Sequence, residues 1–130
     1  MKITIKESKR FIMEDKLKFK SELEKSLLSS RVIIDRPKGS AHPRYPEYIY
    51  PLDYGYIEGT ESQDGGGIDV WCGSENRKEV SGVLVIFDPV KKDSEIKVLI
   101  GCNEEESRAA LECSNRGEMV AITIKLKEEK

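Results

Sequence analysis

Two neighbouring segments carry most of the information about the fold: Tyr50-Pro-Leu-Asp-Tyr54-Gly-Tyr56-Ile57 and Asp64-Gly-Gly-Gly-Ile-Asp69-Val70. The first lies in a region, residues 37–56, that holds four of the five prolines and all five tyrosines. Proline fixes φ and removes a backbone donor, so this region is neither a long helix nor a central strand. A disordered linker would lack the aromatic rings. We therefore predict an ordered loop with short extended segments, anchored by buried rings, and expect site chemistry there.

Regular elements are predicted on both sides of this loop from the apolar periodicity. Alternation over residues 1–5 predicts a short strand, and a stripe of leucines over 14–29 predicts an amphipathic helix. Asn103, with Glu106 three residues later, has the pattern of a capping box and predicts a helix that ends near Ser114. Further strands are expected at 31–35, 68–73, 80–88, 95–101 and 119–126, with a hairpin connection at 88–94.

This order of elements, mostly strands with one helix near each end, predicts a small α+β barrel-like domain. The chain has 130 residues, a length that fits one domain spanning 1–130. Within it we expect an N-terminal strand and helix extension over 1–30 and a core over 31–126.

The composition argues against several classes of protein. A formal net charge of -2 does not suit a protein that binds nucleic acid mainly by neutralising phosphates. The longest apolar run, Val83-Leu-Val-Ile-Phe87, is too short to span a membrane, and residues 1–6 lack a signal-peptide pattern. The three cysteines form no Cys-x-x-Cys pair, so neither a disulfide framework nor a zinc knuckle is expected. We expect a cytoplasmic protein with reduced thiols and no membrane partner.

The acidic residues offer a candidate metal site. Asp64 and Asp69 lie five residues apart with three glycines between them, so both carboxylates can face one point, where Mg²⁺ would accept them as ligands. The alternative is a solvated glycine turn with a capping aspartate. Asp88 and Asp93 are either ordinary hairpin residues or two further ligands, and four clustered carboxylates would require divalent cations.

Candidate phosphate-binding residues lie in the proline-rich region. Arg36, Lys38 and Arg44 form a basic cluster, which is either a grip on phosphate or a solvated loop. Tyr54 and Tyr56 would share one face of an extended segment. Tyrosine hydroxyls there can donate to phosphate oxygens, although core packing and base stacking are competing uses of the rings. His42, the only histidine, is expected to be structural or to face solvent.

The order of these motifs resembles the soluble family I inorganic pyrophosphatases. Those enzymes carry Tyr-Pro-x-x-Tyr-Gly-(Phe/Tyr)-Ile and then Asp-Gly-Asp-Pro-(Leu/Val)-Asp-Val. Val32-Ile-Ile-Asp35 and Gly82-Val-Leu resemble two further family strands, and Asp88 and Asp93 keep the spacing of the family's second acidic pair. The resemblance covers residues 32–93. The run Asp35-Arg-Pro-Lys-Gly-Ser and the triple glycine are similar to those of a short bacterial branch of that family.

The resemblance implies a small five-stranded OB-like barrel with flanking helices and Mg²⁺-dependent hydrolysis of pyrophosphate or a related phosphoanhydride, with Mn²⁺ as an alternative metal. It also implies a homo-oligomer. By the same resemblance Asp64, Asp69, Asp88 and Asp93 would be metal ligands and Asp35 an outer-shell acid. Tyr50 and Tyr54 would support the site or the phosphate.

The chain departs from the family in three places. The segment between the strand at 31–35 and Tyr50 is shortened, so the family's lysine, acid and arginine there have no clear counterparts, and Lys38 and Arg44 are substitutes by chemistry alone. The family's middle aspartate is Gly66 here, and the lysine after the second acidic pair falls on Glu95, with Lys97 as the nearest replacement. We predict Asp64, Asp69, Tyr54 and Lys97 as the catalytic set and Arg36, Lys38, Arg44 and Tyr50 as the substrate-binding set.

Two alternatives to a hydrolase remain open. One is a degenerate homologue that binds metal and a phosphorylated ligand without turnover. The other is an OB-type module that binds single-stranded nucleic acid through the tyrosines, a partner that the net charge disfavours.

Overall fold

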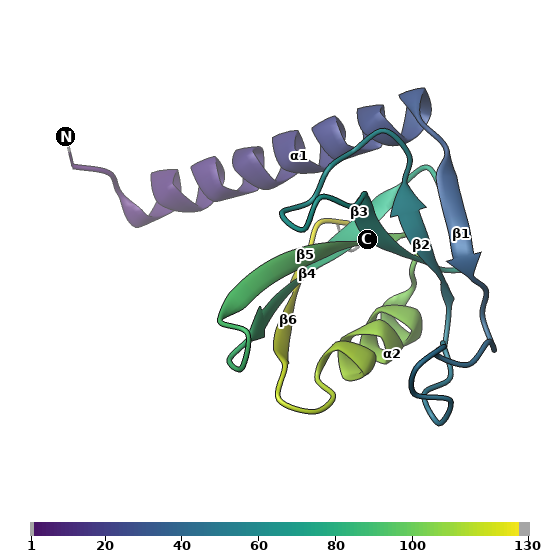
Figure 1. The fold of residues 1–130 in the computed structure, drawn as a ribbon. Coiled ribbons are helices and arrows are strands. Elements are labelled where there is room, and N and C mark those ends of the chain that lie inside the picture. Colours follow the sequence, from purple (N-terminus) through teal and green to yellow (C-terminus); the bar gives the residue numbers. More distant parts are fainter. Residues whose placement is uncertain (1, 128–130) are drawn as a thin grey trace.

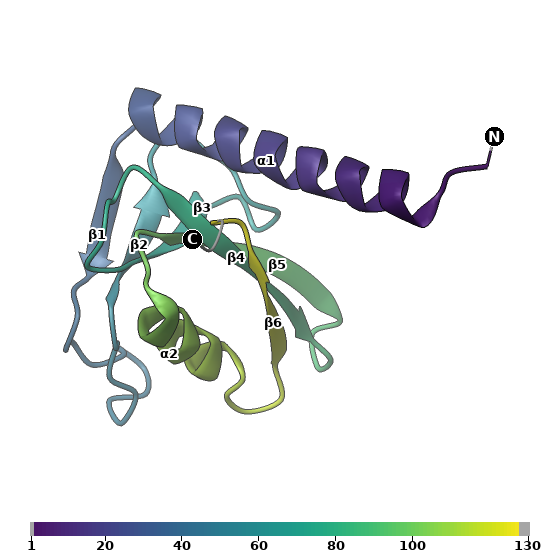
Figure 2. The same ribbon diagram turned by 180° about the vertical axis from the view of Figure 1, so that it is seen from behind.

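The computed structural model describes residues 2–127, which form a curved sheet with a helix on each face (Figures 1 and 2). The elements follow in the order α1 (Ile5–Ser29), β1 (Val32–Arg36), β2 (Asp53–Ile57), β3 (Ile68–Cys72), β4 (Val80–Asp88), β5 (Asp93–Ile100), α2 (Glu104–Ser114) and β6 (Val120–Lys125). The predicted α+β class is therefore confirmed. Among the described residues, no helix is both long and apolar enough to cross a lipid bilayer.

The strands form one six-stranded mixed sheet with the order β1-β2-β3-β5-β4-β6. Strands β3 and β5 pair in parallel, and the other neighbours are antiparallel. The expected five-stranded barrel is not confirmed, because β1 and β6 are the two ends of the strand order and do not pair with each other within residues 2–127. The sheet nevertheless curves around α2 (Figure 1).

Alternate residues of the central strands enter two separate cores, because successive side chains of a strand point to opposite faces. Val70, Val83 and Val98 belong to the α1-side core, with Leu23 and Leu27 of α1. Their neighbours Trp71, Leu84 and Leu99 belong to the α2-side core, with Ala110 and Leu111 of α2. The apolar runs of these strands therefore follow from burial on both faces.

Helix α1 begins earlier than its leucine stripe predicts. Thr4 caps it, with the hydroxyl oxygen accepting a hydrogen bond from the Glu7 amide at 3.1 Å. The strand predicted at 1–5 is wrong for residues 2–5, since 2–4 are irregular and Ile5 is already helical; Met1 lies outside the described residues. The cap explains the difference, because a threonine that satisfies an amide of the first turn favours a helix start over a strand.

The other predicted elements are confirmed, with shifts of one or two residues at several ends. The strands expected at 31–35, 68–73, 80–88, 95–101 and 119–126 are β1, β3, β4, β5 and β6. The capping box of α2 has both of its bonds, from the Glu106 amide to Asn103 and from the Asn103 amide to Glu106, at 2.8 and 2.9 Å.

Strand β2 lies between β1 and β3 and contains the Tyr-Gly-Tyr part of the first segment. Gly55 is required there because a Cβ at this position would lie 1.7 Å from the carbonyl oxygen of Ile33 in β1. The sequence does not separate β2 from the preceding loop, because tyrosines occur in both and Pro51 lies only two residues before the strand.

The proline-rich stretch before β2 is the ordered loop that was predicted. Two backbone hydrogen bonds join its two sides. The Gly39 amide donates to the Tyr50 carbonyl at 2.8 Å, and the Tyr50 amide donates to the Ser40 carbonyl at 2.9 Å. Nearer the tip, the His42 amide donates to the Tyr48 carbonyl at 2.8 Å. We call residues 39–50 the aromatic loop, since it carries His42, Tyr45, Tyr48 and Tyr50.

Candidate functional site

The centre of the candidate site is a hydrogen-bonded triad on three adjacent strands. The Tyr54 hydroxyl of β2 donates to Asp69 Oδ2 of β3 at 2.8 Å, and Lys97 Nζ of β5 donates to the Tyr54 hydroxyl oxygen at 2.5 Å. Lys97 Nζ also lies 3.8 Å from Asp69 Oδ2. The pairing of Val70 with Val98 places Asp69 and Lys97, one residue earlier in each strand, on the same face of the sheet.

The charges around the triad favour a protonated tyrosine and an anchored lysine. Burial raises the pKa of Tyr54 above its ordinary value, and the Asp69 carboxylate raises it further, so this hydroxyl remains a hydrogen-bond donor. Lys97 Nζ lies 3.9 Å from Glu95 Oε1, so the ammonium group stands between two carboxylates. It also lies over the Tyr54 ring, 4.7 Å from the centroid.

A cavity of about 560 Å³ opens beside this triad, between the sheet, the aromatic loop and the end of α2. Six rings line it and form a continuous series. Centroids are 4.6 Å apart for Trp71 and Tyr54, 5.4 Å for Tyr54 and Tyr50, and 6.2 Å for Tyr50 and His42. The series continues to Tyr45 and Tyr48, with further spacings of 5.3 and 5.6 Å. Charged residues also line the cavity: Asp88, Lys91, Glu95, Lys97, Arg116 and Glu118.

The predicted basic cluster is dispersed around the outside of this cavity. Arg36 Nη1 donates to the Tyr50 hydroxyl at 2.5 Å, so Arg36 reaches the site only through that ring. The Lys38 amide donates to Asp53 Oδ1, and the Arg44 amide donates to His42 Nδ1. Within residues 2–127, the side chains of Arg36, Lys38 and Arg44 are not among those that line the cavity. Only Tyr50, of the predicted substrate-binding set, lines it directly.

The two aspartates of the glycine segment lie in different environments. Asp69 belongs to the triad, whereas Asp64 is exposed in the turn before β3. There Asp64 accepts hydrogen bonds from the Ser62 hydroxyl and from the Gly66 amide. These two bonds, Ser62 first, lower the pKa of Asp64, and the charge of Lys97 lowers it further. These bonds hold the Asp64 carboxylate within its own turn.

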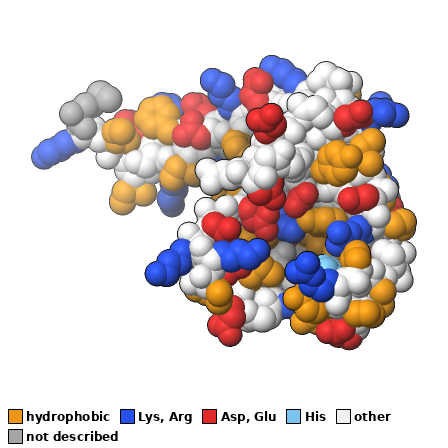
Figure 3. All heavy atoms as spheres, viewed as in Figure 1, with side chains coloured by type: hydrophobic (Ala, Val, Ile, Leu, Met, Phe, Trp, Pro, Cys, Tyr) orange, Lys and Arg blue, Asp and Glu red, His pale blue; other side chains and the backbone are white. Residues whose placement is uncertain are grey.

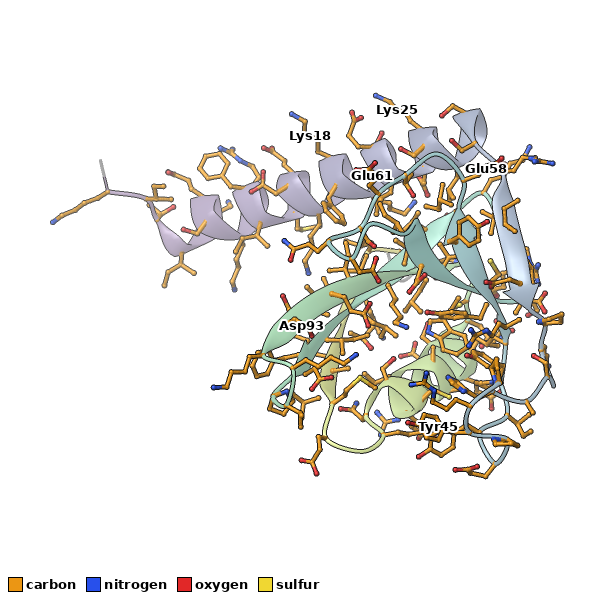
Figure 4. The ribbon with its side chains drawn as sticks, viewed as in Figure 1. Lys18, Lys25, Tyr45, Glu58, Glu61 and Asp93 are labelled. Carbon is orange, nitrogen blue, oxygen red and sulfur yellow. The ribbon has the colours of Figure 1, made fainter. Side chains whose placement is uncertain are left out.

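The remaining predicted metal ligands lie farther out. Asp88 Oδ1 accepts hydrogen bonds from the Val90 and Lys91 amides of its own hairpin, although Asp88 also lines the cavity. Asp93 pairs opposite Asp88 at the start of β5 and is exposed (Figure 4). Asp35 occupies the irregular position of β1, between the partners of Gly55 and Tyr54. Among the described residues, no three His, Cys, Asp or Glu side chains converge closely enough to hold a metal ion.

Sequence reasoning missed several residues of the site. The sequence marks Glu95 only as a departure from the family pattern, yet it flanks Lys97. Trp71 follows Asp69 by two residues in β3, so strand alternation alone places it on the same face. Arg116, whose guanidinium carbon lies 4.6 Å from the centroid of Tyr48, has no signal in the sequence, because the contact depends on how α2 packs.

Comparisons with known proteins give matches at the level of structure. No known protein-family model and no curated protein sequence matches the chain. An inorganic pyrophosphatase from Coxiella burnetii is similar with a TM-score of 0.49 and 15% identity, over 72% of this chain and 82% of that one. The Helicobacter pylori enzyme has a TM-score of 0.49 and 13% identity, over 72% of this chain and 81% of that one. The Neisseria gonorrhoeae enzyme has a TM-score of 0.44 and 18% identity, over 68% of this chain and 77% of that one. Similarity at this level does not extend to activity or metal content.

Proposed function

We propose that this protein hydrolyses a phosphoanhydride, pyrophosphate or a related compound, with Mg²⁺ or Mn²⁺ as cofactor. One observation carries the proposal: Tyr54, Asp69 and Lys97 form a single hydrogen-bonded group at the wall of a cavity. Tyr54 and Asp69 belong to the two motifs that resemble the pyrophosphatases. The lysine supplies the positive charge that a phosphate requires.

Each member of the triad has a part in this chemistry. Lys97 offers an ammonium group, fixed by the Tyr54 hydroxyl, to phosphate oxygens on which charge develops. Tyr54 holds the Asp69 carboxylate in one orientation, and its raised pKa keeps the donated proton in place. Lys91 and Arg116 line the same cavity and would contact the more distant phosphate.

The oxygen donors fit a cation that binds together with the phosphate, rather than a preformed metal cage. Mg²⁺ commonly takes one or two carboxylates, with phosphate oxygens and water completing its octahedron. Asp69 and Glu95 flank Lys97, and Asp64 lies in the adjacent turn. When bound, the metal would neutralise phosphate charge and lower the pKa of a water molecule.

Metal binding tests this fit without any turnover. We expect Mn²⁺, followed by electron paramagnetic resonance, to bind weakly alone and much more tightly with imidodiphosphate. Asp64→Asn and Asp69→Asn should each weaken the ternary complex, whereas Asp15→Asn on α1 should not. Equal Mn²⁺ affinity with and without imidodiphosphate would contradict a site completed by phosphate.

Phosphate release from pyrophosphate is the direct test of the function. Loss of one charge-assisted contact costs roughly 1.5–3 kcal/mol, so Lys97→Met should lower kcat/KM about ten- to a hundredfold. Lys18→Met is the matched control, because Lys18 points away from the sheet (Figure 4). The proposal fails if the wild type releases no phosphate with Mg²⁺ or Mn²⁺, or if Lys97→Met is as active as the control.

A second candidate, binding without turnover, is favoured by one observation: position 66 is glycine where the family carries its middle aspartate. A chain of this kind would form the ternary complex with Mn²⁺ and imidodiphosphate and release no phosphate. The two measurements above therefore separate the candidates.

A further inference from the structure

The cavity has two chemically different ends. One end holds the Lys97 ammonium and its flanking carboxylates, and the other is the aromatic loop, with the ring series joining them. Pyrophosphate consists of phosphorus and oxygen alone, so it can use only the charged end. The aromatic end and the volume of about 560 Å³ suit a larger ligand with a flat apolar part.

The aromatic loop holds its rings in place without burying them. Tyr45 is 47% exposed, although its amide and that of Arg44 both donate to His42 Nδ1. The tip is also closed by a bond from the Tyr48 amide to the Tyr45 carbonyl at 2.9 Å. Exposed rings on a braced backbone can stack on a base at little cost in conformational entropy.

A second feature of the cavity wall is a buried donor without an acceptor. Trp71 is buried and lines the cavity, and among the described residues its indole Nε1 has no hydrogen-bond partner. Buried donors are rarely left unpaired, so a polar atom of a ligand is a natural partner for this group once the side chains that cover it shift slightly.

We propose that the ligand of this cavity is a nucleoside di- or triphosphate, with its base on His42 and Tyr45 and its phosphates at Lys97. The position of the phosphates rests on the proposed function, while the position of the base rests on the aromatic loop. A mononucleotide fits better than a nucleic-acid strand, because the basic side chains that line the cavity are Lys91, Lys97 and Arg116, enough for the phosphates of one nucleotide and too few for a continuous phosphate backbone.

Two non-hydrolysable diphosphonates test the proposal: α,β-methylene-ADP and methylenediphosphonate, with Mg²⁺ present. They differ only in the adenosine, and the fluorescence of Trp71, the only tryptophan, reports binding. We expect α,β-methylene-ADP to bind about five- to a hundredfold tighter, the contribution typical of one stacked base. Equal affinities would overturn the nucleotide proposal and leave the proposed function intact. Failure of both to bind would overturn both.

Variants locate the base. Tyr45→Ala should lower the affinity for α,β-methylene-ADP by a similar factor and leave that for methylenediphosphonate unchanged. Tyr45→Phe keeps the ring and should retain the affinity, and Phe11→Ala, an exposed ring on α1, is the matched control. An unchanged affinity in Tyr45→Ala, or tighter binding of a single-stranded oligothymidylate than of α,β-methylene-ADP, would contradict the proposal.

A different observation concerns the N-terminal half of α1. Ile5, Ile12 and Phe19 repeat every seven residues and continue the face that packs on the sheet through Leu23 and Leu27. This half of the helix stands clear of the body, and its hydrophobic side chains are exposed (Figure 3).

The sheet has the complementary exposed surface. Val83 and Ile124 lie in or against the α1-side core, and the same face continues to the exposed residues Phe87, Ile96, Val120 and Ile122. The apolar stripe on the N-terminal half of α1 therefore has no sheet packed against it, and the apolar end of the sheet has no helix packed against it. In one chain the two diverge (Figures 1 and 2), whereas a twofold-related copy would bring each against the other.

We infer that two copies of this chain associate by placing the N-terminal half of α1 of each on the β4–β6 face of the other. Sedimentation of the full chain should show a dimer. Ile12→Asp and Ile122→Asp, at positions 55% and 62% exposed, should each give folded monomers by circular dichroism, while Leu28→Asp, off the stripe, stays dimeric. A monomeric wild type, or a dimer that both variants leave intact, would overturn the inference.

Discussion

If the protein hydrolyses a phosphoanhydride as proposed, Gly66 is the residue whose replacement should change the rate most directly. Its φ is not in the left-handed region, and a Cβ there would meet only Asp64 Oδ1, at 3.3 Å. Gly66→Asp should therefore fold normally and restore the carboxylate that the family uses near the attacking water. A positioned base contributes about 10²–10⁴-fold, so we expect phosphate release to rise by roughly 10²-fold at saturating Mg²⁺.

The uncharged variant Gly66→Asn is the control for this prediction, because it has nearly the same size and no carboxylate. It should not exceed the wild type in single-turnover hydrolysis. A folded Gly66→Asp protein with no gain in rate would mean that another group activates the water.

Two buried thiols make the stability of the protein sensitive to alkaline pH. Burial raises the pKa of Cys72 to about 11 and that of Cys102 to about 12. The unfolded chain releases these protons near pH 8.5, so unfolding is favoured as the pH rises from there towards the folded pKa values. Between pH 8 and 10, under reducing conditions, each thiol should lower the free energy of unfolding by roughly 2 kcal/mol, so the wild type should lose roughly 4 kcal/mol more than Cys72→Ala/Cys102→Ala.

Urea denaturation at the two pH values measures this difference. The comparison uses each protein's own change with pH, so the stability lost through the alanine cavities cancels. Equal pH dependence in the two proteins would show that the thiols titrate normally in the folded state.

Among the elements, β2 depends most strongly on one backbone contact. Gly55→Ala would place a Cβ 1.7 Å from the Ile33 carbonyl oxygen and force β1 away from β2. Because Tyr54 belongs to the same strand, we expect the variant to lose both the fold and the triad. Thermal denaturation followed by circular dichroism should then show no cooperative transition. Gly66→Ala is the control, because its Cβ would meet only the exposed Asp64 side chain, at 3.3 Å from Oδ1, and its free energy of unfolding should stay within about 1 kcal/mol of the wild type.

Helix α2 depends on its cap in a milder way. The Asn103 side chain accepts from the Glu106 amide, and Glu106 Oε2 accepts from the Ser74 amide after β3. Asn103→Ala should lower the free energy of unfolding by about 1 kcal/mol. Asn103→Ser, which retains a capping oxygen, should recover most of the loss, and equal losses in both would argue against capping.

For the molecule as a whole, strands and capping signals were readable from the sequence because local residues determine them. Val80–Asp88 and the Asn103–Glu106 box are examples in which a short apolar run or a residue spacing is sufficient. The open sheet and the dispersal of Arg36, Lys38 and Arg44 were not readable, because they depend on which strands pair and how the aromatic loop folds back. The triad was partly readable: the motifs gave Tyr54 and Asp69, and Lys97 was the nearest replacement for the family's lysine. Their contact was not readable, because it depends on the parallel pairing of β3 with β5.

The attachment of α1 to the sheet gives the last prediction, because two adjacent leucines of one helix differ completely in environment. Leu27 is 8% exposed and lies in the α1-side core, whereas Leu28 is 68% exposed. Glu24 supports the same contact by accepting from the Val80 amide at 3.0 Å. Leu27→Ala should lower the free energy of unfolding by about 2–4 kcal/mol, and Leu28→Ala by less than about 0.5 kcal/mol. Equal effects in urea denaturation would mean that α1 is not anchored on the sheet, and that residues 1–30 do not contribute to the core.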